Sequence, residues 1–333
     1  MIASHRESGI ADAHRKGVVQ PFGMKDRRLV TQLNARDVTG LFWAAMLDCP
    51  APRSSSKQSP VRRNLKQEIK ESLLQGFIVD KLRSELNDPV EYTLLLDEGE
   101  FKLNEAIGSR LRMKFTGNAG CTHCGRKQVF KQGYCFPCTQ TLAQCDFCIL
   151  SPEKCHFHEG TCRDEEFAKT HCFIPHLVYL SLSSHVKVGL TRKGNENIRW
   201  VDQGAVGATP LLELEDRKTA GEAETLLKEL FSDKTSWQRM LKESPDRYED
   251  LEEAYTRAVD FLAEKGMKAL EYNLTKISYP IESHPAKVKS YNPKKIPELE
   301  DELQGIKGQY LIFSNGVLNM RNWQGYEIIL EEV

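Results

Sequence analysis

Cysteines are the residues of this chain whose spacing most clearly indicates a chemistry. Nine of the ten cysteines lie between residues 121 and 172 of the 333-residue chain. The first four form two Cys-x2-Cys pairs separated by ten residues, namely Cys121 with Cys124 and Cys135 with Cys138. Thiolates bind soft metals well, and this double spacing is typical of a tetrahedral structural zinc site. The sequence therefore predicts one zinc ion held by these four side chains, with glycines at 125 and 133 supplying the tight turns.

A second set of cysteines and histidines follows, and its ligand assignment stays open at the level of sequence. Cys145 and Cys148 repeat the Cys-x2-Cys spacing. Two partners would come from a set of five residues further along the chain: Cys155, His158, Cys162, Cys172 and His176. We expect a second zinc ion here, with an iron–sulfur cluster, which also uses thiolate ligands, as the alternative.

The composition restricts where such a protein works. No run of about 18 apolar residues occurs, so the sequence predicts no membrane-spanning helix and no membrane partner. The first residues lack the apolar stretch of a secretory signal. Dense Cys-x2-Cys usage without such a signal favours metal binding in a reducing compartment over disulfides. We therefore expect a cytoplasmic protein.

Charge is distributed unevenly along the chain, although the formal net charge is only -1. Residues 101–200 carry 14 basic and 8 acidic side chains, a net +6, whereas residues 201–333 carry 17 basic and 25 acidic side chains. A basic module with zinc knuckles suits a phosphate backbone, so nucleic acid, either DNA or RNA, is the expected partner. An ordinary solvated surface is the alternative explanation of the same charges.

The elements that must position these residues follow from hydrophobic periodicity, which predicts an α+β fold in six segments. They are a disordered basic extension (1–65), a helix over 66–87 followed by strands (66–118), the cysteine-rich module (119–176), an α/β segment (177–232), a helical segment (233–275) and closing strands (276–333). We expect the strands at both ends to build one β-domain, into which the module and the helices are inserted.

Within these segments the periodicity also predicts individual elements. Short strands are expected over 178–182, 186–190, 210–214 and 276–281, and helices over 219–231 and 246–271. The stretch 307–330 reads as strands with turns at Asn315-Gly316 and Gln324-Gly325.

The residues CTHCGRK, QGYCFPC, LAQCDFC, VYL, KVGLTR, RW and DQGA, in this order, resemble a bacterial family named domain of unknown function 2797. The resemblance covers roughly residues 85–330. The family is named for its lack of an assigned activity, so the resemblance implies kinship rather than function.

The stretch 177–232 also resembles the GIY-YIG nuclease fold. The resemblance places Tyr179 on the first motif and Lys187 on the second, and it implies Arg199 as the arginine of the next helix and Glu224 as the metal-binding glutamate. In such nucleases the tyrosine and a metal-bound water attack a phosphodiester, the arginine stabilises charge on the phosphate, and the glutamate holds Mg²⁺. Lys187 stands where the family usually has tyrosine, so a fold that binds nucleic acid without cleaving it is the alternative.

Three functions follow as hypotheses. The first is a zinc-binding, nucleic-acid-binding protein, with Mg²⁺-dependent phosphodiesterase activity through Tyr179, Lys187, Arg199 and Glu224. The second is a redox or metal-sensing module with an iron–sulfur cluster between Cys145 and Cys172. The third is a non-catalytic zinc scaffold that binds another protein.

Overall fold

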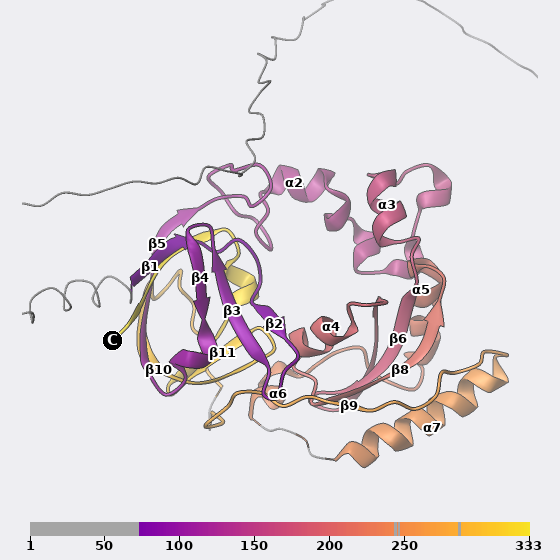
Figure 1. The fold of residues 1–333 in the computed structure, drawn as a ribbon. Coiled ribbons are helices and arrows are strands. Elements are labelled where there is room, and N and C mark those ends of the chain that lie inside the picture. Colours follow the sequence, from indigo (N-terminus) through magenta and orange to yellow (C-terminus); the bar gives the residue numbers. More distant parts are fainter. Residues whose placement is uncertain (1–72, 243–244, 246, 286–287) are drawn as a thin grey trace, which may run out of the picture. The chain divides into compact units, whose positions relative to one another are not determined.

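The computed structural model of the chain describes residues 73–242, 245, 247–285 and 288–333 (Figure 1). The extension predicted over 1–65 and the start of the helix predicted over 66–87 lie outside the described residues. From residue 73 onward that predicted helix is wrong, because Leu73–Phe77 (β1) and Arg83–Glu85 (β2) are strands. Strand β1 pairs with β13 (Tyr326–Glu332) at the other end of the chain. This long-range pairing overrides the local helical spacing of the leucines.

The β-domain joins strands from the beginning and the end of the described residues. Its larger sheet has six antiparallel strands in the order β1-β13-β5-β10-β11-β12. The further strands of that sheet are β5 (Arg110–Ala119), β10 (Glu298–Lys307), β11 (Tyr310–Phe313) and β12 (Gly316–Asn319). A second sheet pairs β2, β3 (Glu91–Leu96) and β4 (Gly99–Lys102). Because β5 lies between β13 and β10, the first and last described segments share one core, and Figure 1 shows indigo and yellow strands together.

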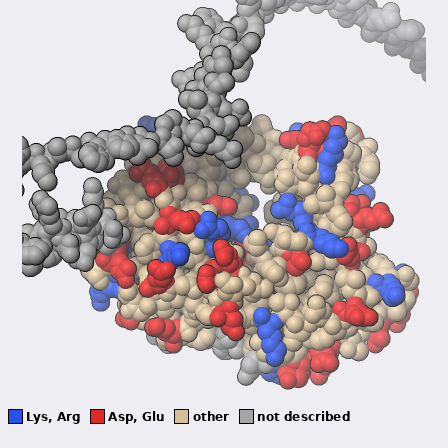
Figure 2. Space-filling view, in the orientation of Figure 1, with Lys and Arg blue, Asp and Glu red and all other residues tan. Residues whose placement is uncertain are grey.

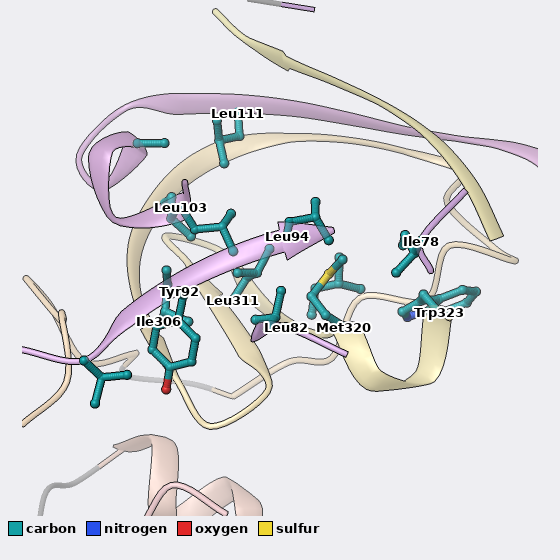
Figure 3. Close-up of a cluster of buried hydrophobic side chains, with 14 of the residues drawn as sticks. Ile78, Leu82, Tyr92, Leu94, Leu103, Leu111, Ile306, Leu311, Met320 and Trp323 are labelled. Atoms are coloured by element: carbon teal, nitrogen blue, oxygen red, sulfur yellow. The ribbon is translucent and has the colours of Figure 1, made fainter. Parts of the chain in front are cut away.

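The core of the β-domain follows from the alternation of apolar residues along its strands. In β5, Leu111 and Met113 are fully buried whereas Arg110 and Lys114 are exposed. Figure 3 shows Leu111 in the same cluster as residues from other strands and turns: Ile78, Leu94, Leu311 and Trp323. Period-two burial of this kind fixes the register, since a shift by one residue would turn the apolar set toward solvent.

The second unit of structure is a four-stranded sheet in the order β7-β6-β8-β9. Its strands are β6 (His176–Leu182), β7 (Val186–Arg192), β8 (Gly207–Leu214) and β9 (Thr275–Lys276). Its helices are α4 (Glu196–Asp202), α5 (Arg217–Leu227), α6 (Trp237–Lys242) and α7 (Tyr248–Glu264). The strands predicted over 178–182, 186–190 and 210–214 are thus confirmed, but the one predicted over 276–281 shrinks to the two residues of β9.

The central strand β6 is buried along its whole length because helices cover both of its faces. Val178 and Leu180 pack in one core with residues of α5 and α7. Tyr179 points the other way and packs with Trp200 of α4, their ring centroids 5.9 Å apart. Figure 1 shows α4 and α7 on opposite sides of this sheet. The two faces therefore differ, with an apolar core under α5 and α7 and a polar tyrosine under α4.

Two helix ends differ from the sequence-based expectation for local reasons. Helix α5 begins at Arg217 because the Asp216 side chain accepts a hydrogen bond from Thr219 N at 2.9 Å. Helix α7 ends at Glu264 instead of 271 because Gly266 adopts a φ of 73°. A left-handed glycine just past the last turn is a strong helix stop.

The cysteine-rich module contains short elements only. Its helices are α2 (Phe136–Thr141) and α3 (Glu165–His171), and its 3-10 turns are η2 (Ala143–Cys145), η3 (Phe147–Ile149), η4 (Pro152–Lys154) and η5 (Phe157–Glu159). Two further turns, η1 (Leu103–Ala106) and η6 (Met320–Trp323), belong to the β-domain. Within the described ranges, no helix combines the length and apolarity that crossing a bilayer requires.

Candidate metal centre and candidate active site

The first four cysteines come together as a candidate metal centre. The Sγ atoms of Cys121, Cys124, Cys135 and Cys138 all lie within 4.8 Å of one another, and those of Cys124 and Cys135 are 3.6 Å apart. A tetrahedral zinc with Zn–S bonds of about 2.3 Å would separate its sulfurs by about 3.8 Å. The four thiols therefore fit a single zinc ion, as the sequence predicts.

Two tight turns and a hairpin bring these thiols together. Gly125 and Gly133 have φ values of 71° and 81°, in the left-handed region that glycine adopts without strain. Between them, Phe130 N donates to the carbonyl of Tyr134 at 2.7 Å. Burial opposes ionisation of Cys121, but the backbone N–H groups of Cys124, Cys135 and His123 lower its pKa to about 6. The backbone thus stabilises a thiolate, which is the form that binds metal.

The later cysteines do not form a knuckle around the Cys145 and Cys148 pair. Cys148, Cys155, Cys162 and Cys172 line one small cavity, and Cys145 is absent from that lining. Burial raises the pKa of Cys145, and its charged neighbours are Arg163, Cys121 and Lys131, which places it toward the first four cysteines.

The two predicted histidine ligands take part in other contacts. The ring of His158 packs edge-on against Phe157. Nδ1 of His176 contacts the carbonyl of Ile174 at 2.7 Å, while its buried Nε2 has no partner among the described residues. Across the described ranges, neither histidine joins a group of three ligand atoms.

The structure brings together three residues that the sequence analysis did not combine: Asp146, Cys148 and His156, whose ligand atoms lie within 4.8 Å of one another. Asp146 is almost fully buried, and Nε of Arg163 lies 2.8 Å from its carboxylate. No spacing rule marks an isolated aspartate, so only the fold reveals this group.

A second candidate site lies on the face of β6 that α4 covers. Tyr179 is fully buried, and its hydroxyl donates to Gln203 Oε1 at 3.0 Å. Gly189 is its partner on β7, where an added Cβ would come within 2.6 Å of the tyrosine oxygen. A side chain at 189 would displace the ring, so the glycine is what lets Tyr179 cross β7. Burial raises the pKa of Tyr179, so the phenol stays protonated at neutral pH.

Arg199 and Glu224 approach the same tyrosine from two helices. Arg199 of α4 is a hydrogen-bonding neighbour of Tyr179, and its Nε is buried without a partner in the described part of the chain. Burial works against the arginine charge, but Tyr179, Asp202 and Glu224 together raise its pKa. The Glu224 side chain of α5 is 12% exposed, and burial raises its pKa despite Lys228 at 3.2 Å. The arginine therefore keeps an unused donor next to a partly desolvated carboxylate.

Lys187 of β7 completes the cluster. It is 3% exposed, and its Nζ donates to Thr235 Oγ1 at 2.6 Å. Burial and the nearby Arg199 charge lower its pKa to about 8, although Asp233 and Glu224 oppose that effect. A buried lysine with such a pKa can exchange a proton near neutral pH, as general bases do.

The fold thus brings together Tyr179, Lys187, Arg199 and Glu224, the four residues that the resemblance implied as catalytic. Titratable groups that perturb one another in this way are typical of functional sites, although structural ion-pair networks produce the same signature. The sequence did not single out Gln203, Asp233 or Thr235, which support the cluster through single hydrogen bonds or charges. Nothing in local periodicity marks such residues.

Glu224 is the residue of this cluster that could hold a cation. Among the described residues, Glu224 belongs to no group of three or more potential metal ligands. Mg²⁺ commonly binds through one or two carboxylates, with waters and substrate phosphates completing its shell. One oxygen of this carboxylate already has a cationic partner, because Lys228 Nζ lies 3.2 Å from Glu224 Oε2.

Basic side chains line two neighbouring hollows outside the cluster. The first, of about 730 Å³, is lined by Lys131, Lys289, Lys294 and Lys295 together with aromatic residues, and no acidic residue is among its described lining. The second, of about 670 Å³, is lined by Lys81, Arg192, Arg321 and one acid, Asp80. Gln132 lines both, so the two hollows lie beside the same residue. Figure 2 shows acidic and basic side chains interspersed over the visible face, so the lining of the hollows is more informative than net charge.

Comparison with known proteins gives one match. The family model described as "Protein of unknown function (DUF2797)" matches residues 108–328. No curated protein and no solved structure matches the chain.

Proposed function

The chain belongs to the DUF2797 family, whose description names no activity, and from the geometry we propose that it binds nucleic acid and hydrolyses phosphodiester bonds. The observation that carries this proposal is that Tyr179, Lys187, Arg199 and Glu224, from two strands and two helices, lie close enough to perturb one another electrostatically. Its sequence basis is the resemblance to GIY-YIG nucleases over 177–232. The zinc centre formed by the first four cysteines would have a structural role.

Each residue of the cluster has a role that its environment supports. Arg199 Nε, buried without a partner among the described residues, can donate to a phosphate oxygen and stabilise developing charge. Lys187, with its pKa lowered to about 8, can accept a proton from the attacking water. Tyr179 stays a neutral donor, held by Gln203, and orients the attacking group. Glu224 would hold Mg²⁺, which supplies Lewis-acid stabilisation of the phosphate when bound.

The two basic hollows support nucleic acid as the substrate class. Phe130 is 61% exposed at the rim of the first hollow, and Tyr291, Trp323 and Tyr326 also line it. Lysines neutralise phosphates, while exposed aromatic rings offer stacking surfaces for unpaired bases. The hollow that shares Gln132 extends to Arg192 at the end of β7, the strand that carries Lys187. A single strand of nucleic acid is therefore the favoured substrate.

Cleavage of labelled single-stranded and duplex DNA and RNA, with and without Mg²⁺, tests the proposal. We expect Mg²⁺-dependent products from the wild type, and loss of them in Glu224→Gln. Glu222→Gln is the matched control, because Glu222 lies on the same helix with a side chain 54% exposed and outside the cluster. Zinc content and thermal melting of each variant would show that the fold is retained. Neither cleavage nor salt-dependent binding by the folded wild type would refute the proposal.

A second function is favoured by exposed apolar residues on the cysteine-rich module. Leu150 is 78% exposed, Phe136 54% and Phe147 53%, which is unusual for large apolar side chains in one small segment. These residues would let the zinc-bound module act as a scaffold for another protein. Recovery of one defined partner after nuclease treatment, lost in Leu150→Ser, would support the scaffold over nucleic-acid binding.

A further inference from the structure

We propose that Cys148, Cys155, Cys162 and Cys172 are the ligands of a second metal centre of the iron–sulfur type, and that Cys145 is outside it. All four cysteines line one cavity, whose other walls include Ile149, Phe157 and Phe173. A thiol-lined cavity with apolar walls matches the chemistry of a soft metal centre kept away from water. This inference goes beyond the proposed function and does not depend on it.

Four short segments of the cysteine-rich module carry the four thiols. Cys148 lies in η3, Cys155 directly follows η4, Cys162 precedes α3, and Cys172 ends α3. Helix α5 holds these turns from outside: Arg217 N donates to the carbonyl of Cys172 at 2.8 Å, and its Nη2 donates to that of Ile149 at 2.7 Å. The cavity is therefore built by packing against a helix rather than by a local Cys-x2-Cys knuckle.

Charge around the cavity suits an anionic centre. Arg217 interacts electrostatically with Cys172 and Cys148, and its buried Nε has no hydrogen-bond partner in the described part of the chain. Arg163 also lines the cavity. A centre with four thiolate ligands carries net negative charge, which these two guanidinium groups would offset.

The neighbouring group of Asp146, Cys148 and His156 is less suited to hold the metal. Both carboxylate oxygens of Asp146 already have partners, since Arg163 Nε lies 2.8 Å from Oδ2 and His156 Nε2 lies 3.3 Å from Oδ1. Nδ1 of His156 contacts Thr161 Oγ1 at 2.7 Å. Aspartate and histidine thus form a hydrogen-bonded support beside the cavity, and Cys148 is left to face the other three cysteines.

The separation of the thiols distinguishes this centre from the first. Sulfurs around a single zinc would be about 3.8 Å apart, as the first four cysteines nearly are. Within the described ranges, no three of Cys148, Cys155, Cys162 and Cys172 appear as a group with all Sγ atoms within 4.8 Å. Thiolates that surround a cluster of several iron and sulfide ions stand further apart than thiolates on one ion. The wider arrangement around one cavity therefore favours an iron–sulfur cluster over zinc.

Anaerobic purification of the full chain, followed by metal and acid-labile sulfide analysis, tests the assignment. We expect zinc, iron and sulfide in one protein, with visible charge-transfer absorbance. Cys162→Ser should remove iron, sulfide and colour while zinc at the first centre is retained, and Cys155→Ser should do the same. Cys145→Ser is the matched control and should keep all three.

Each alternative result is informative. A colourless protein with two zinc ions, one of them lost in Cys162→Ser, would overturn the iron–sulfur assignment. A centre that survives Cys162→Ser but is lost in Cys145→Ser would overturn the ligand set. Because retained zinc reports folding of the first centre, loss of iron alone cannot be attributed to global unfolding. None of these readouts involves nucleic-acid cleavage, so failure here is distinguishable from failure of the proposed function.

Discussion

Replacement of Lys187 by methionine should stabilise the protein and, under the proposed function, strongly reduce phosphodiester cleavage. Lys187 is 3% exposed, and burial and Arg199 lower its pKa from 10.5 to about 8. At about 1.4 kcal/mol per tenfold change in proton affinity, that shift corresponds to about 3 kcal/mol of cost for keeping the charge. Methionine removes this cost but also removes the hydrogen bond to Thr235, worth about 1 kcal/mol. We expect a net gain of about 2 kcal/mol at pH 7.

The pH dependence of this gain has a defined sign. The folded pKa of Lys187 lies below its unfolded value, so the unfolded chain binds the extra proton between pH 8 and 10.5. The cost is therefore fully present below pH 8 and disappears as the pH rises toward 10.5. The stability difference between Lys187→Met and wild type should shrink over that window. Denaturant unfolding at several pH values, at fixed free zinc, measures it.

Activity provides the second readout. Loss of a general base typically lowers a rate by on the order of 10²-fold or more. Lys307→Met is a useful control, because burial also lowers the pKa of Lys307 to about 8, whereas Lys307 is not among the groups that shift the pKa of Lys187. That variant should retain cleavage. A destabilised Lys187→Met protein with unchanged cleavage would refute both the electrostatic reasoning and the catalytic role.

Three further perturbations test other contacts. Gly189→Ala should lower the free energy of unfolding by about 1–3 kcal/mol and reduce cleavage, because the new Cβ would come within 2.6 Å of the Tyr179 oxygen. Gly120→Ala is the control: the nearest atom to its new Cβ lies at 3.7 Å, so the melting temperature and the cleavage rate should be nearly unchanged. Lys294→Ala should weaken binding to single-stranded oligonucleotides and reduce the slope of the log binding constant against log salt concentration by about 1. An unchanged slope in a salt titration would contradict the place of Lys294 in the interface. Chelation of zinc under reducing conditions should lower the melting temperature and unfold the first four-cysteine centre, and an unchanged melting curve of metal-free protein would argue against a structural ion.

The sequence by itself determined the features whose cause is local. The ligands of the first centre are two short pairs, so their spacing and the glycines at 125 and 133 are sufficient to predict the site. The strand around Met113 follows from the alternation of buried and more exposed residues, and the strand around Tyr179 follows from a short apolar run. In each case the stabilising contacts repeat along one short window, which a pattern of residue types records.

Tertiary structure alone decided the features that depend on distant partners. Strand β1 looks helical in isolation, but it becomes a strand because β13 offers it hydrogen bonds from the other end of the chain. The cysteines from 148 to 172 meet around one cavity only because turns separated in sequence pack against α5. The lowered pKa of Lys187 likewise arises from burial and from Arg199 on another element. Burial, electrostatic fields and long-range pairing depend on which segments meet in space. The spacing of residues within one segment does not determine which distant segment packs against it.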